Sequence, residues 1–206
     1  GNYIRCVAKY LYDRMIVRKE EMEIETASGV RHVSLYTTDG RVTSVCVDMG
    51  MADLRASAVP VLLPGDTVIN RGVTIAGQSY EITCVSMGNP HCVVFVDRVD
   101  DVALETIGPA FEHNAIFPER VNTEFVRVVN ETTLRLRVWE RGNGETLACG
   151  TGACAAAVAA IENGYCRKNA DIIVKLPGGD LIVNVTDSGV TLTGNARMVY
   201  EGTVEI

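Results

Sequence analysis

The sequence predicts an α+β fold of two pseudo-symmetric domains, in each of which antiparallel strands wrap round a central buried helix. Three observations lead to this prediction. Residues 153–161 are almost wholly alanine, valine and isoleucine, which indicates a helix that is buried on every side. Several segments alternate apolar and polar residues, as strands do when one face is buried. The third observation is an internal repeat.

The repeat relates the first part of the chain to the last. Each copy has the order helix, strand, glycine-containing turn, strand, aspartate-containing turn, strand. Three segments have counterparts in the same order: residues 1–2 in 150–151, residues 24–29 in 174–179, and residues 38–43 in 186–191. The counterpart of Cys149 then stands one residue before Gly1, so we expect upstream sequence with a second cysteine there. The expected domains are residues 1–49 with 195–206, where the N-terminal part of the domain is missing, and residues 50–194.

Periodicity and turn residues predict the individual elements. Apolar residues three and four positions apart, from Ile4 to Leu11, predict a helix at the start of the chain. Residues 82–85 and 93–96 predict two strands on either side of a Gly-Asn-Pro turn at residues 88–90. No segment has the composition of a linker.

A short helix is expected in the middle of the chain. Asp100 and Asp101 are of a type that favours helix starts, and Gly108-Pro109 would end the helix. After it, clean alternation predicts three more strands, at residues 134–138, 181–185 and 190–193.

Composition and charge narrow the class of protein. The formal net charge of −7 argues against nucleic acid or an anionic membrane as a partner, and no apolar run is long enough to cross a membrane. Seven cysteines, an odd number, favour reduced thiols in the cytoplasm over a disulfide framework. Because no cysteine or histidine pair has the spacing of zinc ligands, we expect no metal site.

The strongest functional signal is Cys149, which precedes Gly150-Thr151-Gly152 at the start of the buried helix. A thiol there lies beside unpaired backbone N–H groups and the positive end of the helix dipole. We expect both to lower its pKa and to favour the thiolate. The same N–H groups can hold a substrate carboxylate. The alternative interpretation is a buried structural thiol.

Other polar positions suit substrate binding, and each has a structural alternative. Glu140 and Arg141 follow a strand that ends at Trp139. They form either a solvated turn pair or a clamp in which arginine holds a carboxylate and glutamate an ammonium group. Asn122 is either a turn residue or a neutral carboxylate donor. His91, which follows the Gly-Asn-Pro turn, is by itself more typical of a hydrogen-bonded structural histidine.

Taken together, these motifs resemble the diaminopimelate epimerase family. The segments that carry the resemblance follow the family's order and span nearly the whole chain: residues 1–6 with 8–10, residues 87–91 (Met-Gly-Asn-Pro-His), residues 120–126 and residues 139–157. The string Glu-Arg-Gly…Glu-Thr…Ala-Cys-Gly-Thr-Gly-Ala is specific to that family. Proline racemases share only its Cys-Gly-Thr-Gly core.

The resemblance implies a cofactor-independent epimerase that converts LL-2,6-diaminopimelate to the meso isomer, for lysine and peptidoglycan precursor synthesis. One cysteine removes the α-proton and another, on the opposite face of the carbon, returns a proton. By position, Cys149 is one of these groups and His91 supports the site beside it. The implied substrate-binding residues are Gly1, Asn2, Asn89, Asn122, Glu140, Arg141, Gly150 and Thr151. The implied partner is a small amino-acid substrate, with a homodimer as the default assembly.

Two departures from the family pattern leave other functions open. The second cysteine is not in the sequence, and Tyr3 stands where the family usually has glycine. A related racemase that uses no pyridoxal phosphate, or a non-catalytic amino-acid-binding relic, is an alternative with the same fold. A redox thiol protein is another. Glu140 and Arg141 discriminate among substrates, because a monoamino acid has no distal zwitterion for them to hold.

Overall fold

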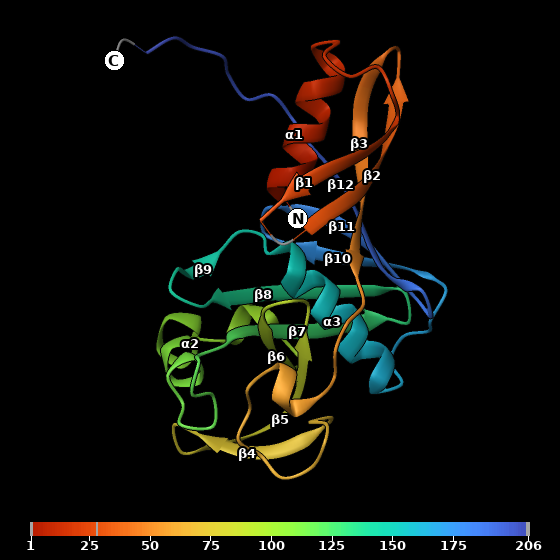
Figure 1. Ribbon diagram of the computed structural model, residues 1–206. Coiled ribbons are helices and arrows are strands. Elements are labelled where there is room, and N and C mark those ends of the chain that lie inside the picture. Colours follow the sequence, from red (N-terminus) through yellow and green to blue (C-terminus); the bar gives the residue numbers. More distant parts are fainter. Residues whose placement is uncertain (1, 28, 205–206) are drawn as a thin grey trace. The chain divides into compact units, whose positions relative to one another are not determined.

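The computed structural model describes residues 2–27 and 29–204. The chain divides into two compact units: residues 1–47 with 193–206 (unit 1) and residues 48–192 (unit 2). Strands and helices occur in both, which confirms the α+β class (Figure 1). The domain bounds expected from the sequence stay a prediction. Within the described residues, no helix combines the length and apolar character needed to cross a bilayer.

Unit 1 begins with a helix followed by strands: α1 (Asn2–Asp13), β1 (Glu21–Thr26), β2 (Gly29–Thr38) and β3 (Arg41–Gly50). The strands pair antiparallel in chain order. Asp39 and Gly40 make the expected turn between β2 and β3, both with positive φ. The apolar stripe predicted for α1 is confirmed at Ile4 and Ala8, which are buried. Lys9 ties the helix to the start of β3, because its Nζ donates to the backbone carbonyl of Val42 at 2.6 Å.

Unit 2 is built on a mixed sheet. Its strands are β4 (Arg71–Ile75), β5 (Gln78–Ser86), β6 (Pro90–Phe95), β7 (Asn122–Asn130), β8 (Thr133–Glu140), β9 (Gly144–Thr146), β10 (Asp171–Leu176) and β11 (Gly179–Thr186), and β12 (Gly189–Asn195) follows them. The sheet order is β11-β10-β8-β7-β6-β5-β4, with β9 paired to β8. The predicted strands at 82–85, 134–138 and 181–185 are confirmed. The prediction of antiparallel strands is incomplete, because β6 pairs with β7 and β10 with β8 in parallel.

The centre of unit 2 is α3 (Gly150–Glu162), which confirms the predicted buried helix. Ten of its 13 residues are buried. The helix packs against strands that precede it in the sequence, β5 to β8, and against strands that follow it, β10 and β11 (Figure 1). Small side chains permit this, because alanine keeps the helix narrow enough to be enclosed by strands. The helix is followed by β10, β11 and β12, so the order of a helix and three strands seen in unit 1 recurs here.

A second apolar cluster in unit 2 surrounds α2 (Leu104–Glu112), and here the sequence prediction was partly wrong. Asp100 and Asp101 belong to a separate 3-10 turn, η2 (Val99–Asp101), and do not cap α2. Another 3-10 turn, η1 (Ala56–Ala58), lies earlier in the unit. The helix also continues through Pro109, the sixth of its nine residues, whose missing N–H group removes one backbone hydrogen bond.

Gly108 has a packing role instead of ending α2. A Cβ atom at Gly108 would lie 2.3 Å from Cδ2 of Trp139, so the absence of a side chain lets the helix approach the indole ring. Turn-forming and close-packing glycines look alike in a sequence. The tertiary contact with Trp139 on β8 decides between them.

We expect Gly108→Ala to destabilise the protein, although alanine favours helices by about 1 kcal/mol. The added methyl group must displace the Trp139 ring, and overpacking of this kind costs about 1–3 kcal/mol. Urea unfolding measures the change. Gly72→Ala is the matched control, because a Cβ at Gly72 would meet no atom of the described part of the chain within 4 Å. Equal unfolding midpoints for the two variants would contradict the packing role.

Candidate active site

Cys149 is the N-cap residue of α3, as the sequence predicts. Its backbone is extended, with φ −123° and ψ 112°, and its Sγ accepts a hydrogen bond from the backbone N–H of Gly152 at 3.3 Å. The thiol is 7% exposed. A Cβ at Gly152 would lie 2.6 Å from Oε1 of Glu124, so this glycine makes room for a buried carboxylate beneath the helix start. The structure therefore places a thiol, the N–H groups of the first turn and a carboxylate together.

The pKa of Cys149 is the main correction to the sequence prediction. Burial of the thiol raises its pKa to about 12, and the negative charges of Glu124 and Glu140 act in the same direction. Hydrogen bonds from the Thr151 hydroxyl and the Gly152 N–H lower the pKa, as expected of a helix start. They are outweighed, because burial removes water from the thiolate and the nearby carboxylates repel it. At neutral pH Cys149 therefore rests as a thiol, ready to donate a proton.

A chain of polar contacts runs from Cys149 into the core of unit 2. It comprises Thr151 Oγ1 at 3.6 Å from Cys149 Sγ, Asn89 Nδ2 at 3.3 Å from Thr151 Oγ1, His91 Nε2 at 3.0 Å from Asn89 Oδ1, and Glu124 Oε1 at 2.7 Å from His91 Nδ1. His91 and Glu124 are wholly buried. The hairpin of β5 and β6 positions both residues: Asn89 lies in its turn, where Gly88 has a positive φ of 88°, and His91 is the second residue of β6.

Sequence reasoning missed Glu124 as a site residue. It lies on β7, where five consecutive residues from Asn122 onward are buried. In the parallel pairing of β6 with β7 it lies opposite Val93. The available signal was a glutamate in the stretch 122–126, whose other residues are apolar or neutral. A carboxylate is almost never fully buried without a partner, so this position could have been marked for a search.

Glu140 is the last residue of β8, and Arg141, which follows it, contacts the predicted residue Asn122. Oδ1 of Asn122 accepts from the backbone N–H of Arg141 at 2.9 Å, and its Nδ2 donates to the carbonyl of Pro90 at 2.7 Å. Asn122 thus links the turn that carries Arg141 to the start of β6. The Arg141 side chain donates to the carbonyl of Glu119 at 3.0 Å. The structure brings these residues together in unit 2, and their binding roles stay a prediction.

Glu112, at the end of α2, is a second carboxylate that sequence reasoning missed. It is 3% exposed and accepts hydrogen bonds from Trp139 Nε1 at 2.7 Å and from the backbone N–H of Gly142 at 2.9 Å. Arg120 Nη1 lies 3.3 Å from it. Burial alone raises the pKa of Glu112, but these hydrogen bonds and the charges of His113 and Arg120 outweigh it, and the net pKa is lowered. Glu112 therefore anchors the turn at residues 140–143.

The predicted residues at the start of the chain belong to unit 1. Gly1 lies outside the described residues, so its role is untested. Asn2 begins α1, and its Oδ1 accepts from Arg5 Nη2 at 3.0 Å. Tyr3 is 83% exposed. Substrate binding by Gly1 and Asn2 stays a prediction.

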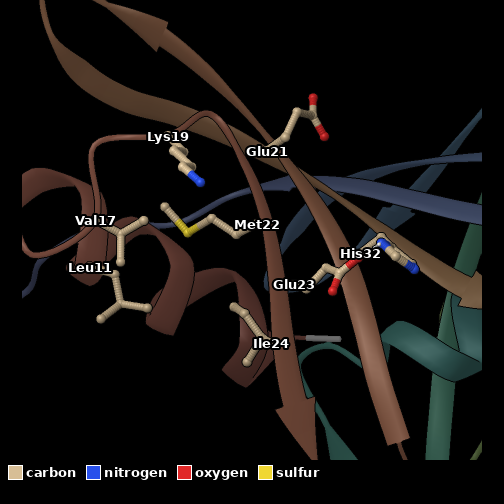
Figure 2. A pocket seen from close by; sticks show the side chains of 8 residues that line it. All are labelled: Leu11, Val17, Lys19, Glu21, Met22, Glu23, Ile24 and His32. Atoms are coloured by element: carbon tan, nitrogen blue, oxygen red, sulfur yellow. Dashed lines mark ion pairs between the residues drawn. The ribbon is translucent and has the colours of Figure 1, made fainter.

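Unit 1 has a pocket of its own, between α1 and β1, with a volume of about 480 Å³. Figure 2 shows apolar side chains on one side of it, from Leu11, Val17, Met22 and Ile24. His32 Nδ1 lies 3.4 Å from Oε1 of Glu23 on its polar side. None of the predicted site residues that the structure describes lines this pocket.

Comparison with known proteins shows the family to which the chain is similar. The model of the diaminopimelate epimerase family matches residues 83–199. Diaminopimelate epimerase from Acetivibrio thermocellus is 48% identical over 208 residues, which cover 100% of this chain and 74% of that protein. The enzyme of Geobacillus kaustophilus is 50% identical over 204 residues, which cover 98% and 70%. The chain belongs to the diaminopimelate epimerase family.

The fold of this diaminopimelate epimerase family member is also similar to solved structures of proteins with low sequence identity. The crystal structure of a probable proline racemase from Agrobacterium radiobacter, with bound carbonate, superposes with a TM-score of 0.70 at 16% identity. The match covers 95% of this chain and 64% of the racemase. At that identity the likeness shows a shared fold alone, and it agrees with the fold class predicted from the sequence.

We expect Glu140→Gln to speed alkylation of Cys149 at pH 9 by about threefold or more, because it removes a negative charge that disfavours the thiolate. Peptide mapping by mass spectrometry gives the rate at Cys149 separately from the other six cysteines. Glu119→Gln is the matched control, since Glu119 is exposed and is not among the groups that shift Cys149. A Glu140 variant with the control's rate would show that Glu140 does not act on the thiol.

We expect protonation of Glu112 at acid pH to remove its contribution to the stability of the fold. Its pKa is lower in the folded protein than the usual 4.5, so the carboxylate stabilises the fold above pH 4.5, and this contribution disappears as the pH falls through the folded-state value. Urea unfolding followed by Trp139 fluorescence, the signal of the sole tryptophan, measures this at pH 6 and pH 4. We expect the loss of stability between these values to be smaller in Glu112→Gln. A loss equal to that of the unsubstituted chain would contradict the anchor.

Proposed function

We propose that this chain epimerises LL-2,6-diaminopimelate to the meso isomer, with Cys149 as the acid/base group on one face of the α-carbon. Membership of the diaminopimelate epimerase family and identities of 48% and 50% to two diaminopimelate epimerases support the reaction. The reaction makes the chain an isomerase of lysine and peptidoglycan precursor synthesis. The observation that carries the residue assignment is the thiol of Cys149 at the N-terminus of the buried helix α3.

The geometry suits a carbanion-forming reaction. The N–H groups of Gly150 and Thr151 belong to the first turn of α3, where the helix itself offers no acceptor. They would hold the α-carboxylate and, with the helix dipole, stabilise the charge that spreads onto it when the α-proton leaves. Enclosure of the site strengthens this effect, because little water screens the charges.

The protonation state of Cys149 decides whether it donates or accepts the α-proton. As a thiol, its Sγ–H bond breaks and the proton passes to the α-carbon, which leaves a thiolate. In the reverse direction the thiolate takes the α-proton and becomes a thiol again. Inversion also needs a base or acid on the opposite face with the complementary protonation state. Unit 2 supplies one face of this pair through Cys149.

Glu140 and Arg141 would distinguish diaminopimelate from a monoamino acid. The guanidinium of Arg141 has five N–H donors, of which one is used by the carbonyl of Glu119, so a bidentate contact with a distal carboxylate remains open. Asn122 and Asn89 would complete the polar lining. His91 would support the site by holding Asn89.

The thiol chemistry also bears on location. All seven cysteines lie within the described residues and are free thiols. A reducing compartment keeps a catalytic thiol active, and this supports a cytoplasmic location for the enzyme.

The function is tested by proton NMR of LL- and meso-diaminopimelate with the reduced chain in D₂O. We expect loss of the α-proton signal, incorporation of deuterium at that carbon and interconversion of the isomers. Cys149→Ala should abolish exchange through this face. Exchange that continues at the same rate in Cys149→Ala would remove Cys149 from the mechanism, and a reduced chain that exchanges neither isomer would overturn the proposed function.

We expect Arg141→Ala to lower kcat/KM for diaminopimelate at least tenfold, which corresponds to about 1.4 kcal/mol of transition-state binding. Steady-state kinetics gives the value, and thermal unfolding shows whether the variant is folded. Arg127→Ala is the matched control, because Arg127 is an exposed arginine on β7, outside the predicted site. Unchanged kcat/KM in Arg141→Ala would exclude the clamp.

A further inference from the structure

We propose that Glu124 is a positioning residue that acts through His91 and Asn89 to direct the Thr151 hydroxyl hydrogen onto Sγ of Cys149. The proposal rests on the proposed function for its catalytic meaning, since Cys149 is the assigned acid/base. Its physical content is the direction of a buried hydrogen-bond chain, which can be measured on the thiol without substrate.

The chain is continuous and closed to solvent at its inner end. Glu124 Oε1 and His91 Nδ1 are 2.7 Å apart, and both side chains have zero exposure. Asn89 and Thr151 connect this pair to Cys149 through contacts of 3.0, 3.3 and 3.6 Å. Because water does not reach the inner pair, the protein groups alone decide which atom donates in each contact.

The direction of the chain follows from the donors available. Oδ1 of Asn89 can only accept, so Nε2 of His91 carries a hydrogen. A second proton then lies between His91 Nδ1 and Glu124 Oε1. The carboxylate makes this arrangement possible, because its negative charge can accept a hydrogen bond from a ring that carries a hydrogen on both nitrogens.

The outer half of the chain is set by the inner half. With Oδ1 of Asn89 turned to His91, its Nδ2 donates to Thr151 Oγ1. The Thr151 hydroxyl has one hydrogen and already accepts from Asn89, so that hydrogen is free to point at Sγ. The hydrogen bond from Thr151 is one of two contacts that lower the pKa of Cys149 against burial and charge. Thr151 therefore favours the thiolate, and Glu124 maintains that contact.

The packing around Glu124 also supports a specific role for its carboxylate. Gly152 leaves space for the carboxylate oxygen, since a Cβ there would lie 2.6 Å from Oε1. Burial of a carboxylate costs free energy that an apolar residue on β7 would not incur. The polar chain to Cys149 gives a physical reason for that cost.

Replacement of the carboxylate by an amide should reverse the chain. In Glu124→Gln, Oε1 accepts from His91 Nδ1–H, and the extra proton has no partner, so Nε2 becomes an acceptor. Asn89 must then turn its Nδ2 to His91 and its Oδ1 to Thr151. The Thr151 hydroxyl would donate to Asn89 and no longer to Cys149.

A double-mutant cycle on the reduced full-length chain tests this coupling. The variants are Thr151→Val, Glu124→Gln and the two together, and the readout is the rate of iodoacetamide alkylation at Cys149 at pH 9, resolved by mass spectrometry. Thr151→Val keeps the backbone N–H and removes only the hydroxyl. We expect it to slow alkylation about threefold or more in the original chain and by less than about 1.5-fold with Glu124→Gln. The cycle is needed because Glu124→Gln alone removes both a repelling charge and the directed hydroxyl, which have opposite effects on the thiolate.

Two further variants keep the test decisive. In Asn89→Asp the new side chain can only accept, so the effect of Thr151→Val should disappear there as well, even if Glu124→Gln does not fold. Thr123→Val is the matched control. Thr123 is wholly buried beside Glu124 on β7, and its Oγ1 has no hydrogen-bond partner among the described residues, so the Thr151→Val effect should persist in full. Circular dichroism melting shows which variants are folded.

The outcomes separate this proposal from the proposed function. Effects of Thr151→Val that are equal in all backgrounds would overturn the directed chain, whatever the activity of the protein. Loss of the effect in Glu124→Gln and Asn89→Asp but not in Thr123→Val would support it. A chain that shows this coupling but exchanges no α-proton would refute the epimerase function and leave the role of Glu124 standing.

Discussion

The site depends on the N-terminus of α3, a helix that is buried among the strands of unit 2. The first N–H groups of α3 have no acceptor within the helix, and the strands around α3 keep water away. Cys149 satisfies one of these groups with its own Sγ. The same burial leaves neighbouring N–H groups available to an anionic substrate. Narrow alanine side chains along the helix make this enclosure possible, so the composition of α3 and the chemistry at its start have one cause.

Opposed electrostatic effects meet at the thiol. The helix start and the Thr151 hydroxyl favour the thiolate, whereas burial and two carboxylates favour the thiol, and the second set is stronger. An epimerase needs a group that can both give and take a proton. A thiol whose state is balanced by several neighbours can change state when substrate charge alters that balance. The structure therefore offers a proton donor at rest with the means to become a base.

Two buried carboxylates organise the surroundings of Cys149. Glu124 supports the hairpin residues His91 and Asn89 from β7, and Glu112 supports the turn after β8 from the end of α2. Each connects a rigid element to a loop that carries predicted binding residues. Charged groups inside a core are costly unless they are paired, and here the pairing partners are the segments that must stay in place.

The sequence by itself determined the family, the α+β class, the buried helix with Cys149 at its mouth, and most strands, because apolar periodicity and turn residues are local properties of a chain. The tertiary structure alone decided the parallel pairing of β6 with β7, the packing role of Gly108 and the positions of Glu112 and Glu124. It also reversed the expected pKa shift of Cys149. A pKa depends on the water excluded and the charges gathered round a group, and strands distant in sequence supply both.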